Sequence, residues 1–319
     1  MKKNPIKPRI IFMGTPEFAV AILDKLLQEK AHIVAVITAV DKPAGRGKKI
    51  HESAVKKYAL ANNISVLQPK NLKNDAFIAE LASYNADLQI VVAFRMLPKV
   101  VWAMPKLGTF NLHASLLPDY RGAAPINWAI INGEEKSGVT TFFIDDKIDT
   151  GNIILQKEVA IKETDSAGDL HDKLMKKGAT LVVKTVNQIT AGTIITKSQK
   201  ELPDAKPAPK LYPETCKIVW ENDLESIYNH IRGLSPYPTA WTTLYVADKP
   251  LKFKIYKATK IADEHHLAPK TIVRTKKTLH IAVKNGFIAL EEVQLAGKRK
   301  MAIQDLLNGL ASNTLLLKD

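Results

Sequence analysis

The chain has 319 residues, of which 46% are hydrophobic and 24% charged, a balance typical of a globular protein long enough for two domains. No apolar run has membrane-spanning length, and the N-terminus enters a strand-like segment without a signal-peptide core, which argues against a membrane protein. Cys216 is the only cysteine, which excludes an intrachain disulfide and a cysteine-based zinc cluster and favours a cytoplasmic protein.

The formal net charge of +14 is spread along the chain. Residues 1–209 carry 29 Lys and Arg against 21 Asp and Glu, an excess of +8, and residues 210–319 carry 17 against 11, an excess of +6. Such a distribution suits an extended polyanion that touches both halves of the chain. A basic surface covered only by solvent has the same charge, so the charge alone leaves both interpretations open.

Apolar, strand-like runs alternate with helical patterns over the first two hundred residues. The periodicity predicts strands at 9–13, 33–38, 88–93, 109–113 and 139–143, and helices at 17–30, 52–62, 75–83, 125–132 and 166–191. This alternation indicates an α/β fold, with a mostly parallel sheet flanked by helices, in which functional groups gather at the carboxyl ends of strands. A G-x-G-x-x-G fingerprint is absent after the first strand, which weakens a dehydrogenase interpretation.

The pattern breaks in a proline-dense stretch at 201–210, which reads as a semi-extended linker. After a helical segment at 223–232, short alternating runs follow at 240–246, 251–258, 271–274, 278–283 and 287–293. Several short strands at close spacing predict a small β-barrel. We therefore divide the chain into a catalytic domain at 1–200, a linker at 201–210 and a barrel domain at 211–319.

The segment from Asn111 to Pro125 carries the clearest chemistry. Asn111 and His113 lie two residues apart, on one face of a strand that ends at the sheet edge. Downstream, Asp149-Thr-Gly151 adds a carboxylate in a turn. An amide donor, an imidazole and a carboxylate suffice to move protons and to stabilise an oxyanion at a carbonyl carbon. The same residues also fit structural roles, as a strand cap, an interior histidine and an ordinary turn.

The longer string N-L-H-A-S-L-L-P-D-Y-R-G-A-A-P, followed by Asp149-Thr-Gly151, resembles the signature of the folate-dependent formyltransferases. The resemblance implies 10-formyltetrahydrofolate as cosubstrate, no metal, and Asn111, His113 and Asp149 as catalytic residues. It implies folate contacts from two further segments, which contain Phe94, Arg95, Ser115, Leu116, Leu117 and Pro118. The segment 93–98 departs from the family, because Phe94-Arg95 stands where many members have Tyr-Gly.

The segment from Asp41 to Lys49 is glycine-rich and strongly cationic. On composition alone it is a solvated basic turn. It resembles the PAGRGKK loop of the methionyl-tRNA formyltransferases, which in that family enters the acceptor arm of the tRNA. Glycines allow a close backbone approach, while lysines and arginines neutralise phosphates. The resemblance implies tRNA contacts from five cationic residues: Lys42, Arg46, Lys48, Lys49 and Arg121. Lys42 keeps the charge, but not the fork, of the arginine common at its position.

The segments 231–241 and 297–301 resemble the second domain of the same family, an oligonucleotide-binding (OB)-like barrel, so the resemblance covers essentially the whole chain. It implies a Rossmann-like first domain. It also implies formyl transfer to the α-amino group of methionyl-initiator tRNA, which yields N-formylmethionyl-tRNA for translation initiation. We expect a monomer that binds the acceptor arm of this tRNA.

Other functions remain open at this point. A formyltransferase acting on a small amine, such as a sugar nucleotide, and a hydrolase releasing formate from the same folate would share the three catalytic residues. A non-catalytic RNA-binding protein is disfavoured by the intact Asn111, His113 and Asp149. Ser115 lacks the surroundings of a covalent nucleophile, and His265-His266 lacks a third metal ligand nearby.

Overall fold

The computed structural model describes residues 7–44, 49–200, 204–310 and 314–317. Within them the chain forms two compact units, neither of which is continuous in sequence. The first contains the residues up to Gly122 together with Gly138–Val159 and Asp172–Pro207; the second contains Ala123–Ser137, Ala160–His171 and the residues from Ala208 onward. The sequence-based division, by contrast, falls at residues 200 and 210.

The first unit holds the α/β part of the chain. Its elements are β1 (Arg9–Gly14), α1 (Glu17–Gln28), β2 (His32–Ile37), β3 (Lys42–Ala44), β4 (Lys49–His51), α2 (Ala54–Ala61), β5 (Val66–Leu67), α3 (Asp75–Ser83), β6 (Leu88–Val92), α4 (Lys99–Trp102), β7 (Thr109–His113), β8 (Arg121–Gly122), β9 (Lys136–Phe143), β10 (Ile153–Ala160), α6 (Ala167–Thr190) and β11 (Pro207–Ala208). β9, β10, α6 and β11 each include at least one residue of the second unit.

Within the described residues, the main sheet has seven strands in the order β10-β9-β7-β6-β1-β2-β5. The neighbours from β7 to β5 run parallel, whereas β7 and β9 are antiparallel. β6 is buried along its whole length, as expected for a strand covered on both faces. The predicted α/β fold with a mostly parallel sheet is therefore confirmed. Because β1, β6 and β7 are parallel, their carboxyl ends meet at one edge.

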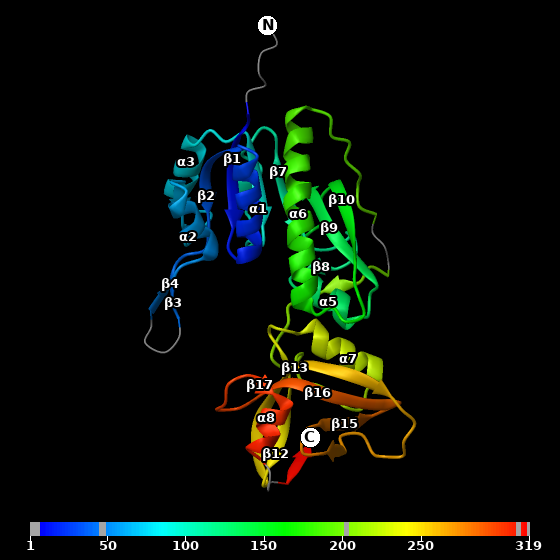
Figure 1. The fold of residues 1–319 in the computed structure, drawn as a ribbon. Coiled ribbons are helices and arrows are strands. Elements are labelled where there is room, and N and C mark those ends of the chain that lie inside the picture. The colour runs from blue at the N-terminus through cyan, green and yellow to red at the C-terminus, as the bar shows by residue number, and fades with distance from the viewer. Residues whose placement is uncertain (1–6, 45–48, 201–203, 311–313, 318–319) are drawn as a thin grey trace. The chain divides into compact units, whose positions relative to one another are not determined.

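Helices cover both faces of this sheet (Figure 1). On one face, Ile11 and Met13 of β1 pack in a buried cluster with Phe77 of α3 and Val101 of α4. The alternate residue Ile10 points to the other face, where it lines a cavity together with residues of α1 and α6. No helix among the described residues is long and apolar enough to cross a membrane.

The second unit holds the C-terminal strands and three helices in the part of it that is described. Its elements are α5 (Pro125–Ile131), α7 (Leu224–Gly233), β12 (Ala240–Val246), β13 (Lys249–Ala262), β14 (Ile272–Arg274), β15 (Leu279–Val283), β16 (Gly286–Leu295), β17 (Met301–Ala302), α8 (Ile303–Asn308) and β18 (Leu315–Leu317).

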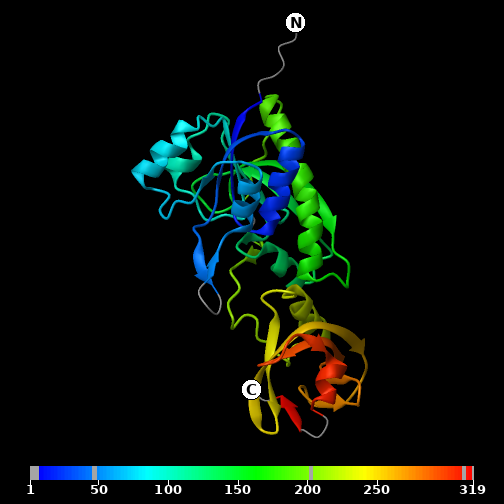
Figure 2. The same ribbon diagram turned by 60° about the vertical axis from the view of Figure 1, so that its left-hand side comes forward.

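The strands of this unit form an antiparallel, nearly closed barrel in the order β14-β15-β16-β13-β12-β18, with β17 added beside β16 (Figure 2). Phe253 and Ile255 of β13 point into a buried core, while the alternate Lys252 and Lys254 point outward. Asp223 caps α7 by accepting a hydrogen bond from the Ser226 backbone N–H at 2.8 Å. The predicted small barrel is confirmed.

Candidate active site

The strand β7 carries Asn111 and His113 to the carboxyl edge of the sheet. Leu112 faces the helix α6, because a Cβ built on Gly178 of that helix would lie 2.8 Å from its Cδ2 atom. By alternation, Asn111 and His113 share the opposite face. Within the described part of the chain, the side-chain amide of Asn111 has no hydrogen-bond partner. A half-buried amide without a partner is available to a ligand.

The imidazole of His113 is hydrogen-bonded at one nitrogen and faces a carboxylate with the other. His113 is only 6% exposed, and its Nε2 lies 2.8 Å from the carbonyl oxygen of Tyr120. A carbonyl can only accept, so Nε2 carries the hydrogen of this bond. Nδ1 lies 3.8 Å from Oδ2 of Asp149. In the neutral ring, Nδ1 is therefore the nitrogen without a hydrogen, and it faces the carboxylate.

Asp149 sits in a turn whose backbone is tightly constrained. Its φ angle of 55° lies in the left-handed region, which is uncommon for a residue other than glycine. Oδ2 accepts a hydrogen bond of 3.0 Å from the backbone N–H of Gly122. Gly151 is required two residues later, because a Cβ there would lie 1.7 Å from the carbonyl oxygen of Phe143. The turn therefore presents the carboxylate to His113 from a fixed backbone.

The segment from Ser115 to Pro118 is held by one hydroxyl group. Thr140 of β9 donates its Oγ1 hydrogen to the Ser115 carbonyl at 2.7 Å and accepts from the Leu117 backbone N–H at 3.2 Å. Gln156 of β10 donates to the same Oγ1 at 3.0 Å and to the Leu117 carbonyl at 2.9 Å. Thr140 thus uses its full hydrogen-bonding capacity on this segment and its neighbour.

The side chains predicted to contact folate lie in different environments. Ser115 is fully buried, and its Oγ donates to the Asp119 carbonyl at 2.6 Å, so its hydroxyl shapes the segment. Leu117 is also buried, in a small cluster with Phe142 and Ile153, whereas Leu116 and Pro118 are partly exposed.

Phe94 and Arg95 line a cavity of about 450 Å³ beyond the carboxyl ends of β1, β2 and β6. Nη1 of Arg95 donates to the Lys70 carbonyl at 3.1 Å, and the guanidinium carbon lies 5.8 Å from the centre of the Phe94 ring. Lys42 and Lys70 line the same cavity. The structure therefore brings two of the predicted folate contacts together with one of the predicted tRNA contacts.

The cationic segment begins and ends in a hairpin of β3 and β4. At its base, Asp41 accepts hydrogen bonds from Lys56 and from Gln68. The hydrogen bond from Lys56 lowers the pKa of the Asp41 carboxyl most, and the one from Gln68 lowers it further. Both favour the charged carboxylate of Asp41 at the foot of the hairpin. Arg46 and Lys48 lie outside the described residues, and of Lys49 only the backbone in β4 is described.

Arg121 lies immediately before the peptide that holds Asp149. Its Nε and Nη2 donate to Oε1 of Gln199 at 3.2 and 2.7 Å. Gln199 in turn donates to the backbone carbonyls of Asp149 and Gly151. The structure thus joins Asp149, His113 and Arg121 through neighbouring backbone and one further side chain.

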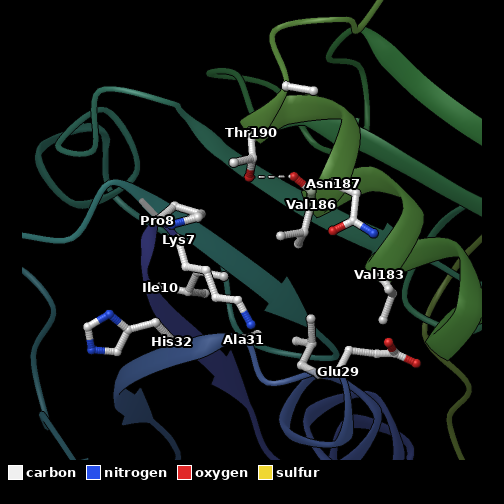
Figure 3. Close-up of a pocket in the computed structure, with 12 residues that line it drawn as sticks. Lys7, Pro8, Ile10, Glu29, Ala31, His32, Val183, Val186, Asn187 and Thr190 are labelled. Atoms are coloured by element: carbon white, nitrogen blue, oxygen red, sulfur yellow. Dashed lines mark hydrogen bonds between the residues drawn. The ribbon is translucent and has the colours of Figure 1, made fainter. Parts of the chain in front are cut away.

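A second cavity, of about 680 Å³, lies near the opposite edge of the sheet (Figure 3). Pro8, Ile10 and His32 come from the amino ends of β1 and β2, and Val183 and Val186 come from α6. None of the predicted site residues lines it. This cavity is therefore not part of the candidate active site.

Two family models match the chain. The model described as formyl transferase matches residues 8–186, and the formyl transferase C-terminal domain matches residues 210–311. A methionyl-tRNA formyltransferase from Flavobacterium johnsoniae is 59% identical over 304 residues, covering 95% of this chain and 96% of the relative. One from Bacteroides thetaiotaomicron is 49% identical over 314 residues, covering 97% of both. The chain belongs to the methionyl-tRNA formyltransferase family.

Solved structures share the fold of this family at lower identity. The N-formyltransferase from Helicobacter canadensis, in complex with folinic acid and dTDP-3-aminofucose, has a TM-score of 0.62 at 24% identity and covers 89% of this chain and 98% of its own. HypX from Aquifex aeolicus, in complex with tetrahydrofolic acid, has a TM-score of 0.65 at 18% identity and covers 96% of this chain but 48% of its own. These likenesses support the fold alone.

The structure adds three residues that the sequence did not single out: Thr140, Gln156 and Gln199. Each is an ordinary polar residue in a stretch without a motif, and each acts through contacts 16 to 78 residues away in the chain. Thr140 lies buried in a strand, where an inward-facing polar residue is a weak signal of a hydrogen-bonded support, whereas Gln156 is an exposed residue of a strand and gives no such signal. No local signal marks Gln199.

Proposed function

We propose that this protein transfers the formyl group of 10-formyltetrahydrofolate to the α-amino group of methionyl-initiator tRNA, acting as a cytoplasmic monomer. The observation that carries the proposal is the Asp149 carboxylate, which is held by the Gly122 N–H and faces Nδ1 of His113. It occurs in a chain that is 59% identical to a methionyl-tRNA formyltransferase over almost its full length. The formyl group is already activated as a carbonyl on nitrogen, so the proposal includes no metal.

The three catalytic residues have separate tasks. The amine attacks the formyl carbon, and negative charge develops on the formyl oxygen. The amide of Asn111, which has no side-chain partner among the described residues, donates a hydrogen bond to this oxygen. His113 takes the proton that the attacking amine loses and returns one to the nitrogen that departs from the formyl carbon. Asp149 orients His113 and stabilises its charged form across the 3.8 Å between Oδ2 and Nδ1.

The cavity of about 450 Å³ supports a folate site near this centre. Phe94 offers an aromatic ring to a flat heterocycle, and Arg95, Lys42 and Lys70 offer positive charge to carboxylates or phosphates. We assign folate contacts to Phe94, Arg95 and the segment 115–118. The rigid backbone of that segment, fixed by Thr140 and Gln156, is suited to present main-chain groups to a ligand.

We assign tRNA binding to two regions. One is the hairpin that carries Lys42, Arg46, Lys48 and Lys49, with Arg121 beside the catalytic residues. The other is the C-terminal barrel, which we propose to be OB-like. Its strand β13 points Lys252 and Lys254 outward. Positive charge in both regions agrees with the excess of +8 and +6 in the two parts of the chain.

The test is a formyl-transfer assay with purified protein and 10-formyltetrahydrofolate. Methionine-charged initiator tRNA, methionine-charged elongator tRNA and free methionine serve as acceptors. We expect rapid formylation of the initiator tRNA and little product on the other two. Folate turnover without formylated tRNA would move the acceptor to a small amine or to water. No turnover with any acceptor would favour a non-catalytic RNA-binding protein.

The cationic hairpin provides a second test. Replacing Arg46, Lys48 and Lys49 together by alanine removes three charges that we expect to contact phosphates. The KM for tRNA should rise at least tenfold and its dependence on salt should flatten, while the KM for folate stays within about twofold. Replacing the exposed Lys73, Lys106 and Lys136 is the matched control for net charge. Equal effects of both triple variants would contradict a specific role of the hairpin.

A further inference from the structure

The side chain of Gln199 uses both ends of its amide. Oε1 accepts from Nε and Nη2 of Arg121, at 3.2 and 2.7 Å. Nε2 donates to the carbonyl oxygens of Asp149 at 2.9 Å and Gly151 at 2.8 Å. These four hydrogen bonds match the two hydrogens and two lone pairs that a primary amide offers. Gln199 is therefore fully engaged within the candidate site.

The backbone before Gln199 fixes where this amide lies. After α6, the chain returns to the start of β10. There, Ile153 and Lys197 exchange two backbone hydrogen bonds, at 2.8 and 2.9 Å. Gln199 follows two residues later and is partly buried. An anchored, partly buried side chain loses less freedom on forming its contacts than a free surface glutamine would. The segment therefore delivers the amide to a defined position.

The contacts of Gln199 converge on the support of the Asp149 carboxylate. The backbone of Asp149 is in the left-handed region, which is unfavourable for a non-glycine residue and needs outside contacts to persist. Gln199 supplies two such contacts, at the carbonyls of Asp149 and Gly151. It also holds Arg121, the residue immediately before the Gly122 N–H that binds Oδ2 of Asp149. Gln199 therefore supports both the backbone that carries the Asp149 carboxylate and the residue next to the N–H that binds this carboxylate.

The same amide sets the orientation of Arg121. With Nε and Nη2 bound to one oxygen, the plane of the guanidinium is fixed. Within the described residues, Nη1 of Arg121 has no hydrogen-bond partner. Its two N–H groups are available to an anion such as a phosphate, one of the ligands that a fixed guanidinium suits.

We propose that Gln199 is a positioning residue that couples the two substrate-facing groups. It keeps the Asp149 carboxylate in place opposite His113, and it presents Arg121 to a phosphate of the acceptor tRNA. It touches neither substrate itself. This inference rests on the proposed function, because formyl transfer to a charged tRNA is the reaction in which both groups are used.

The experiment compares Gln199→Met and Gln199→Glu with the wild type in formylation of methionine-charged initiator tRNA. Methionine keeps the length of the side chain and removes all four hydrogen bonds. We expect kcat to fall about 10- to 100-fold, as misplacement of a catalytic group does, and the KM for tRNA to rise several-fold. The KM for 10-formyltetrahydrofolate should stay unchanged, and the pH midpoint of kcat should move from its wild-type value. Glutamate keeps an acceptor for Arg121 but has no donor, so its kcat should fall as far.

A control variant separates positioning from general destabilisation. Asn74→Ala removes the cap of α3, in which Asn74 Oδ1 accepts a hydrogen bond of 3.1 Å from the Phe77 N–H, and Asn74 is not one of the site residues. This variant should lower Tm but keep the wild-type kcat and pH midpoint. Circular dichroism and thermal unfolding first establish that each variant is folded.

The outcomes distinguish the two proposals. A wild-type protein that formylates no tRNA overturns the proposed function, whatever the variants do. A wild-type protein that formylates tRNA, with Gln199 variants that lose Tm alone, as Asn74→Ala does, overturns the positioning role. If Gln199→Met does not fold, Gln199→Glu decides in the same assay, and a wild-type kcat and pH midpoint in it overturns the positioning role.

Discussion

Three side chains at the carboxyl edge of the sheet differ in how they are held, and the difference predicts their tasks. His113 is bonded at Nε2, and Asp149 is bonded at Oδ2. Asn111 has no side-chain partner within the described residues. A held imidazole and carboxylate are prepared for proton transfer at one fixed place. We therefore predict that the Asn111 amide donates to a charge that appears only during the reaction, as an oxyanion donor must.

Asn111→Ala tests this division at the level of one residue. Because the Asn111 amide makes no side-chain hydrogen bond in the described protein, its removal should leave Tm within about a degree of the wild type. The kcat should fall roughly 10²- to 10³-fold, the usual cost of losing an oxyanion donor. Steady-state kinetics with charged initiator tRNA gives the measurement, and thermal unfolding is the control. A large fall in Tm with a normal kcat would mean that Asn111 is structural.

At the scale of elements, the strands β9 and β10 hold the backbone of the segment 115–118. The hydroxyl of Thr140 on β9 joins the Ser115 carbonyl, the Leu117 N–H and the Gln156 amide. Gly138, in the same strand, lets the segment approach, since a Cβ there would lie 2.4 Å from Cδ2 of Leu116. Two neighbouring strands thus hold a connection that has no regular structure of its own.

Thr140→Val preserves shape but removes the hydroxyl. Because Thr140 is fully buried, its three partners lose a hydrogen bond that water cannot replace. The free energy of unfolding should drop by about 1–3 kcal/mol, and the KM for folate should rise. Denaturant titration measures the first quantity and steady-state kinetics the second. Thr193→Val, at an exposed position after α6, is the matched control and should change neither.

The elements were predictable where apolar periodicity is strong. The strand at 109–113 has the predicted bounds, and α3 at 75–83 and β12 at 240–246 do as well. The apolar periodicity does not predict β10, because its middle, Gln156-Lys157-Glu158, is polar and lacks a strand pattern. β9 was predicted to begin at residue 139, since Lys136-Ser-Gly138 reads as a turn. Gly138 belongs to the strand because Leu116 and the Lys157 carbonyl pack against it.

The site itself was only partly accessible from the sequence. A family motif drew attention to Asn111, His113 and Asp149, and the structure brings the latter two within 3.8 Å. The contacts that position them could not be predicted. They link backbone groups to side chains far apart in the chain, as the bond from Gly122 to Asp149 does, and no spacing rule encodes such pairs.

On the scale of the whole molecule, the two compact units interleave along the chain. Residues 123–137 belong to the C-terminal unit, where α5 packs against α7. Asn127 donates to the Gly233 carbonyl at 2.8 Å, and Ile131 packs against the core of the barrel unit. Cutting the chain in the linker therefore does not separate two complete folding units.

A fragment ending at Lys210 should consequently be destabilised. It loses α7, so Ile131 becomes exposed and Asn127 loses its partner. Exposing a fully buried isoleucine costs about 1.5–3 kcal/mol, and a partly buried one such as Ile131 costs less, so we expect a lower Tm and stronger binding of a hydrophobic dye than in the full chain. The fragment with Ile131→Ser is the control, since it should bind less of the dye. A fragment as stable as the full chain would contradict the assignment of α5 to the C-terminal unit.

The pairing of Lys197 with Ile153 also bears on how the protein behaves at high concentration. β10 is the terminal strand of the seven-stranded sheet in the described chain, and a terminal strand offers unpaired backbone groups to any other strand that approaches. The segment returning from α6 occupies these groups at the start of β10. Further along, the exposed Lys157 and Glu158 put charge on the strand. The segment that positions Gln199 therefore also disfavours the addition of a strand from another molecule to this edge, and with it aggregation.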